Sequence, residues 1–223
     1  MSKKKSFKPL PILAIVFFSV SLILLAVKTV LLQASSMLAG QNSNLLRVFV
    51  NTAVLGLPAA MFIVYSAVSL KRKEKIKSLL CVSLLIQAFS SLYFALRFVF
   101  TNDDWKHIGK EIAFIILFGL SALMCLISAF LVLKGIKARV FIIFAAVFGM
   151  LIPFVLFTWN TMFMIGYGSY YAANIPLLLT RLLGYTAYAL SMVFHFTALI
   201  FIACFRKKKD KEKVTVKIKS KAE

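Results

Sequence analysis

The last apolar segment of the chain carries five side chains whose chemistry differs from that of the residues around them. At steps of four, three, four and three residues, this segment presents Arg181, Tyr185, Tyr188, Met192 and His195. Such spacing repeats on one face of an α-helix, so a cation, two phenols, a thioether and an imidazole would form a polar stripe. A stripe turned toward the interior of a helical bundle could bind a solute and guide it along the helix.

A second interpretation of the stripe needs no ligand. The two tyrosines could belong to an aromatic belt at the membrane surface, together with the three tyrosines found between residues 167 and 171. His195 would then hydrogen-bond a neighbouring helix. Asn51 and Gln87 are further polar side chains that could partner the stripe, although the sequence alone does not pair them. Both interpretations stay open at this point.

Cationic side chains gather near one end of the predicted spans, at Lys28, Arg47, Arg97, Lys110 and Arg181. Several of them could line a vestibule and attract an anionic solute or lipid headgroup, because a guanidinium offers a planar fork to phosphate or carboxylate. Alternatively, long cationic side chains at span ends extend to water without any ligand. The most specific hypothesis places Arg47 and Arg181 together in an outer anion site. The candidate ligand-binding residues are Lys28, Arg47, Arg97, Arg181, Tyr185, Tyr188 and His195.

Groups that most catalytic and cation-transport mechanisms need are missing from the apolar segments. All seven carboxylates lie in connections, at span edges or near the C-terminus, whereas proton relays in membranes use intramembrane Asp, Glu or His. The sequence also has no metalloprotease, serine-hydrolase or phosphate-loop motif. Its three cysteines lie in apolar segments without the spacing of metal ligands. We therefore predict no catalytic residue, no cofactor and no metal site.

The elements that must position these residues are membrane-spanning helices. Hydrophobic residues make up 61% of the 223 residues and charged residues 15%, against roughly 45–50% and 25% in soluble proteins. Apolar runs occupy residues 10–32, 45–70, 79–100, 112–133, 140–157 and 182–205. All but the fifth exceed 20 residues, which is enough to cross a bilayer, and the fifth can lengthen toward Phe163. The predicted fold class is all-α, a polytopic membrane protein with six transmembrane helices.

The distribution of basic residues predicts an orientation for these helices. Of 27 Lys and Arg residues, 21 lie before the first span, in the connections 71–77 and 134–139, and after residue 205. Positive charge near span ends is retained in the cytoplasm. We therefore predict cytoplasmic termini and three hairpins that point outward. The first span could instead be a signal peptide, but its apolar run is longer than the 7–15 residues usual for one.

The predicted domains are a basic cytoplasmic N-terminus (residues 1–9), a six-helix transmembrane domain (10–205) and a basic, disordered cytoplasmic tail (206–223). We expect the protein in the bacterial cytoplasmic membrane. Each even-numbered span begins and ends with a basic residue, 24 or 25 positions apart, or about 36 Å of helix. This regularity could record a repeated hairpin or simply the thickness of the bilayer.

The net charge of +20 sits in short connections and tails rather than on a folded polar surface, so nucleic acid is not the predicted partner. The predicted partners are anionic lipid headgroups at the cytoplasmic face. The function we favour is a non-enzymatic transport or solute- or lipid-recognition component with an outward-facing cationic site. The alternatives are a structural or accessory subunit that binds another membrane protein, and a lipid-modifying enzyme that uses His195.

Overall fold

Six long helices make up the protein in a computed structural model, which describes residues 9–40, 45–72, 76–100, 108–168 and 173–204. The helices of these described residues are α1 (Pro9–Leu38), α2 (Leu45–Arg72), α3 (Lys77–Phe100), α4 (Ile108–Leu133), α5 (Arg139–Gly166) and α7 (Ile175–Cys204). Each is long and apolar enough to cross a bilayer. The chain is therefore an integral membrane protein with several membrane-spanning helices, as the sequence predicts.

Several helices extend beyond the apolar runs that predict them. α1 ends six residues later than expected, α7 begins seven residues earlier, and α5 continues through the mixed stretch to Gly166. As a result Lys28 lies ten residues before the end of α1, or about 15 Å of helix, instead of one turn. The predicted tail, residues 206–223, lies outside the described residues, as does the N-terminus up to residue 8.

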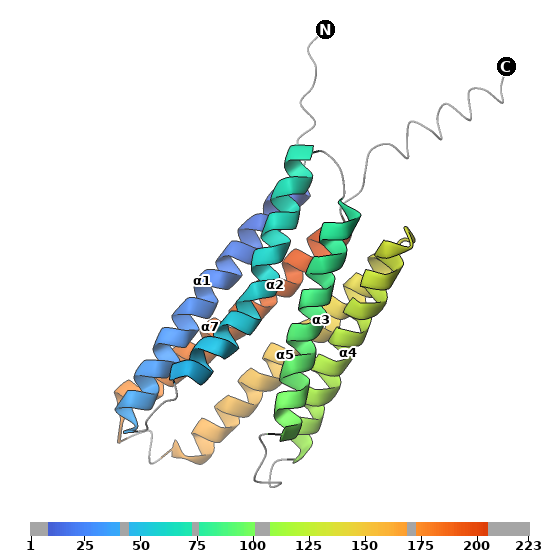
Figure 1. Ribbon diagram of the computed structural model, residues 1–223. Helices are drawn as coiled ribbons and strands as arrows, with labels where there is room; N and C mark the ends of the chain where they lie inside the picture. The colour runs from blue at the N-terminus through green and yellow to red at the C-terminus, as the bar shows by residue number, and fades with distance from the viewer. Residues whose placement is uncertain (1–8, 41–44, 73–75, 101–107, 169–172, 205–223) are drawn as a thin grey trace, which may run out of the picture.

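The helices form a ring around a common interior (Figure 1). Neighbours pack in the order α1, α2, α3, α4, α5 and α7, and α7 packs against α1 to close the ring. The α1–α7 interface is the most extensive of the six, and the α2–α3 interface is the least extensive. α1 begins and α7 ends at the same end of the bundle, which we call the terminal end. The opposite end, where α1 finishes and α2 begins, is the distal end.

Burial along the helices follows the pattern of a bundle surrounded by lipid. Large apolar side chains point outward, and Val30, Phe49 and Phe154 are between 64% and 71% exposed. Buried polar side chains comprise ten serines, Gln87 and His195 among the described residues. Lipid covers apolar side chains without cost, whereas polar side chains find hydrogen-bond partners only within the protein. The polar faces of the helices therefore define the interior of the ring.

Small residues allow α7 to lie close to both of its neighbours. The Phe196 ring of α7 packs directly onto Gly149 of α5, where even a single added methyl group would overlap it. On the other side, Leu32 of α1 packs against Gly184 of α7. Close approach through small residues is the usual basis of helix association in membranes. These contacts fix the rotation of α7 and so direct its polar stripe into the ring.

Candidate functional site

A cavity of about 340 Å³ lies inside the ring, in the half of the bundle nearer the distal end. All six helices contribute side chains to its wall. Its size is at the lower end of the range for small-molecule sites in proteins. Much of the wall is apolar, with aromatic rings from Phe94, Phe114 and Phe118. The cavity therefore suits a ligand that combines a small polar group with apolar surface.

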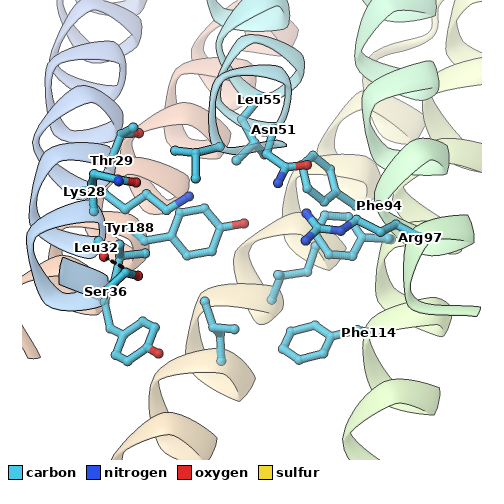
Figure 2. Close-up of a pocket in the computed structure, with 16 residues that line it drawn as sticks. Lys28, Thr29, Leu32, Ser36, Asn51, Leu55, Phe94, Arg97, Phe114 and Tyr188 are labelled. Atoms are coloured by element: carbon cyan, nitrogen blue, oxygen red, sulfur yellow. Dashed lines mark hydrogen bonds between the residues drawn. The ribbon is translucent and has the colours of Figure 1, made fainter. Parts of the chain in front are cut away.

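Two cations extend into this cavity from opposite walls. Figure 2 shows the ammonium of Lys28 on α1 and the guanidinium of Arg97 on α3 directed toward its middle, with the Tyr188 hydroxyl of α7 between them. Lys28 Nζ lies 4.8 Å from the centroid of the Tyr188 ring, within the range of a cation–π contact. A lysine facing lipid deep in the membrane would cost roughly 2.5–3.5 kcal/mol. Turning it inward onto an aromatic ring reduces this cost.

Neutral hydrogen-bonding groups complete the polar part of the cavity. Thr29 on α1 bonds Thr52 on α2 with 2.9 Å between the hydroxyl oxygens, and Asn51 accepts a hydrogen bond of 3.1 Å from Tyr93 on α3. No carboxylate occurs among the lining residues that the structure describes. Lys28 and Arg97 therefore give this lining a formal charge of +2. A site of this composition attracts anions.

A second cavity of about 20 Å³ lies beside the first, and both have Leu55 and Phe118 in their walls. Its volume is close to that needed for one water molecule. His195 Nε2 lies 2.7 Å from Gln87 Oε1, and since an amide oxygen only accepts, Nε2 carries the proton. Gln87 in turn donates to Ser91 at 3.3 Å. This hydrogen-bonded cluster joins α7 to α3 on the terminal side of the main cavity.

The stripe on α7 occupies the interior along most of its length. Tyr185 and Tyr188 line the main cavity, and Met192 and His195 line the smaller one. Arg181 lies one turn before Tyr185, is partly buried, and is not among the residues that line either cavity. The tyrosines thus face the ring instead of the surrounding lipid, while His195 does bond a neighbouring helix. The stripe therefore faces the interior, and His195 bonds a neighbouring helix, while solute binding along the stripe stays a prediction.

The predicted cations do not all meet. Lys28 and Arg97 share the cavity, whereas α1 lies between α2 and α7 in the ring, which separates the helices that carry Arg47 and Arg181. The side chain of Arg47 lies outside the described residues. Lys110, a further cation of the distal end, is likewise not described beyond its backbone.

The candidate site residues predicted from the sequence did not include the buried serines of the interior. Ser191 of α7 donates to the backbone oxygen of Ser21 on α1 at 2.8 Å, and Ser90 of α3 also lines the smaller cavity. A signal for them exists, because the polar residues of α3 recur at helical spacing on the face that contains Gln87. Gln87 itself was a possible partner of the stripe, and the structure pairs it with His195.

Comparisons of this chain with known protein families, with curated proteins and with solved structures find no match. Its function is therefore inferred from the geometry of this chain alone.

Proposed function

We propose that this protein is a non-enzymatic membrane component that binds an anionic, amphipathic ligand in the cavity between Lys28 and Arg97, as a step in its recognition or transport. One observation carries the proposal: two cations enter one cavity from opposite walls, and no described lining residue is acidic. An anion between them would accept charge-assisted hydrogen bonds from both. The guanidinium adds a planar fork that fits phosphate or carboxylate.

The depth of the cavity supports ligand binding over simple anchoring. An anchoring cation at a span end reaches the membrane surface along the lipid-facing side of its helix. Lys28 instead lies ten residues inside α1 and contacts Tyr188 of the neighbouring helix α7. Arg181 and Arg47 belong to the proposal as cations of the distal end, where they would raise the local concentration of anions. Catalysis by His195 has less support, because its Nε2 bonds Gln87 and His195 lines only the smaller cavity.

Orientation follows from the charge distribution. We infer that the terminal end faces the cytoplasm of a bacterial cell, because 21 of the 27 basic residues lie in the segments associated with it. The cavity would then be nearer the outer surface. Basic connections at the cytoplasmic face would bind anionic headgroups there.

The test is stabilisation of the purified protein by anions. Thermal unfolding in detergent is measured with phosphatidylglycerol, phosphatidylcholine or inorganic phosphate added to wild type, Lys28→Gln and Arg97→Gln. A ligand at 100 times its Kd stabilises a protein by about 2.7 kcal/mol. We expect an anionic probe to raise the wild-type midpoint, and each substitution to weaken binding by about 10- to 100-fold, since a charged hydrogen bond contributes about 1.5–3 kcal/mol.

Matched controls exist at the other end of the bundle. Lys134 Nζ lies 4.4 Å from the centroid of the Phe130 ring, which resembles the contact between Lys28 and Tyr188. Arg139 begins α5 at the terminal end. Lys134→Gln and Arg139→Gln remove the same charges without touching the cavity, so they should keep the wild-type response. If all four variants lose the stabilisation by anions equally, that stabilisation depends only on general surface charge, and the proposal is refuted.

A further inference from the structure

The least extensive interface of the ring, between α2 and α3, is bridged by a regular series of hydrogen bonds. Three donors of α3 meet three acceptors of α2: Ser83 Oγ and Met61 O at 3.4 Å, Ser90 Oγ and Val54 O at 2.8 Å, and Tyr93 Oη and Asn51 Oδ1 at 3.1 Å. Steps of seven and three residues along α3 match equal steps in the opposite direction along α2. The two helices therefore meet in one antiparallel register, through a polar seam.

Pro58 explains the shortest of these bonds. In an α-helix the carbonyl of Val54 would accept the backbone N–H of residue 58, but proline has no N–H to give. Ser90 supplies the missing donor from the neighbouring helix. A carbonyl released by proline in a membrane helix must find such a substitute, because no water reaches it. The seam is thus held partly by a bond that exists because α2 is interrupted.

At the level of the cavity this seam is a thin wall. Asn51 lines the cavity, whereas its partner Tyr93 is 37% exposed on the outer surface. Phe94, the residue after Tyr93, also lines the cavity. The outer surface beside the seam is apolar, with Leu57 and Phe89 53% and 64% exposed. The hydrogen bond between Tyr93 and Asn51 therefore joins a side chain of the outer surface to a side chain of the cavity wall.

We propose that the α2–α3 seam is a lateral portal, through which the acyl chain of an anionic membrane amphiphile passes while its headgroup lies between Lys28 and Arg97. This inference rests on the proposed function and specifies its ligand class. A cavity of about 340 Å³ holds a headgroup and a few methylene groups. The remaining chain of a membrane lipid would leave through the wall at the seam, where helix packing is least extensive.

The experiment locks the seam. Val54→Cys and Ser90→Cys, at two positions where α2 and α3 are in contact, are introduced after Cys81, Cys125 and Cys204 are replaced by Ala, and the pair is then oxidised. The matched control is a Ser121→Cys, Ala145→Cys pair between α4 and α5, where a serine also donates to a carbonyl, at 3.2 Å. Exchange of deuterated phosphatidylglycerol into the reconstituted protein is followed by native mass spectrometry. Inorganic phosphate is the soluble probe.

We expect oxidation of the seam pair to slow lipid exchange at least about tenfold, because access that needs a conformational change limits association. Reductant should restore the rate, phosphate binding should persist, and the control lock should have no effect. Lipid exchange that is equally fast through the locked seam overturns the portal and leaves the proposed function standing. If the wild type binds phosphate but not phosphatidylglycerol, the portal is likewise overturned and the proposed function stands. Failure of every anion to bind wild type overturns the proposed function itself.

A second variant covers the case in which the cross-link does not form. Tyr93→Phe keeps the ring and its contact with Phe94, whose centroid lies 5.2 Å away, but removes the hydroxyl that bonds Asn51. Loss of this bond should speed lipid exchange roughly tenfold at most, as expected for a hydrogen bond of about average strength. An exchange rate equal to that of wild type would contradict the role of the seam as a portal.

Discussion

Gln87 is the residue that connects the polar stripe of α7 to the rest of the interior. Its amide oxygen accepts from His195 at 2.7 Å and its amide nitrogen donates to Ser91 at 3.3 Å. Both Gln87 and His195 are about 95% buried, so removal of either partner leaves a buried polar group without its hydrogen bond. The Gln87 side chain therefore does much to hold the imidazole of His195 in place.

Replacement of either partner should destabilise the bundle by about 1–2 kcal/mol, because a buried polar group then lacks its partner. The double variant Gln87→Leu, His195→Phe should lose less than the sum of the single changes, by about 0.6–1.7 kcal/mol, the range found between membrane helices. Unfolding free energies in mixed micelles measure this cycle. Ser128→Ala is the control, since Ser128 bonds only its own helix. Additive losses would show that the 2.7 Å contact contributes nothing.

Part of the site could be predicted at the residue scale. The spacing of Tyr185, Tyr188 and His195 indicated a common face, and polar residues in a span turn inward because lipid offers them no partner. Lys28 and Arg97 were also predicted as candidate cations, each about one turn inside the apparent end of its span. That these two share one cavity could not be predicted, since it depends on where α1 and α3 stand in the ring.

Helix ends show the limit of sequence reasoning at the scale of elements. The six helices follow from their apolar runs, and the sequence also allows α5 to lengthen toward Phe163, but the early start of α7 at Ile175 does not follow from its apolar run. Met164 in the extension of α5 and Leu177 in that of α7 form a small buried cluster of their own. Packing between the two extensions therefore continues both helices past the point where their sequences become mixed in character.

The interface between α5 and α7 allows a test of close packing. Gly149→Ala should destabilise the protein by about 1–3 kcal/mol, the usual cost of overpacking, because the new methyl group overlaps the Phe196 ring. Phe196→Leu, which makes room, should recover part of that loss in the double variant. Thermal and denaturant unfolding in detergent measure both effects.

Gly119 in α4 is the matched control, since a methyl group there meets no atom within 4 Å. Gly119→Ala should therefore leave stability unchanged or raise it by up to about 1 kcal/mol through helix propensity. If the two alanine variants unfold alike, α5 and α7 are not packed as closely as Phe196 and Gly149 indicate.

The order of helices in the ring is a property of the whole molecule that the sequence did not reveal. Apolar surfaces do not select partners in lipid, because lipid tails are as apolar as the side chains. Selection comes from small residues and hydrogen bonds at particular positions, such as the contact of Ser21 with Ser191 that helps to hold α1 against α7. Since these residues are 170 positions apart, only the folded chain brings the first and last helices together and closes the cavity.

The orientation of this ring decides which solution the cavity faces. Lys28 and Arg97 lie toward the distal end, and the basic residues at the other end predict that the distal end is outside. Single cysteines replacing Ser43, Asn102 and Ser169 in a cysteine-free chain should therefore react with an impermeant maleimide in intact cells. A cysteine at Ser78, exposed near the start of α3, should react only after permeabilisation.

All four cysteines should react in permeabilised cells. This control shows that each cysteine can react with the maleimide, so that protection in intact cells reports the side of the membrane. The opposite pattern, with Ser78→Cys labelled in intact cells and the other three protected, would invert the protein and place the cavity nearer the cytoplasm. The portal between α2 and α3 would then open toward lipids of the inner leaflet, because it lies at the depth of the cavity. With the predicted orientation the portal opens toward lipids of the outer leaflet. Protein reconstituted with its distal end outside, in vesicles labelled in one leaflet, should therefore exchange lipid with the outer leaflet first.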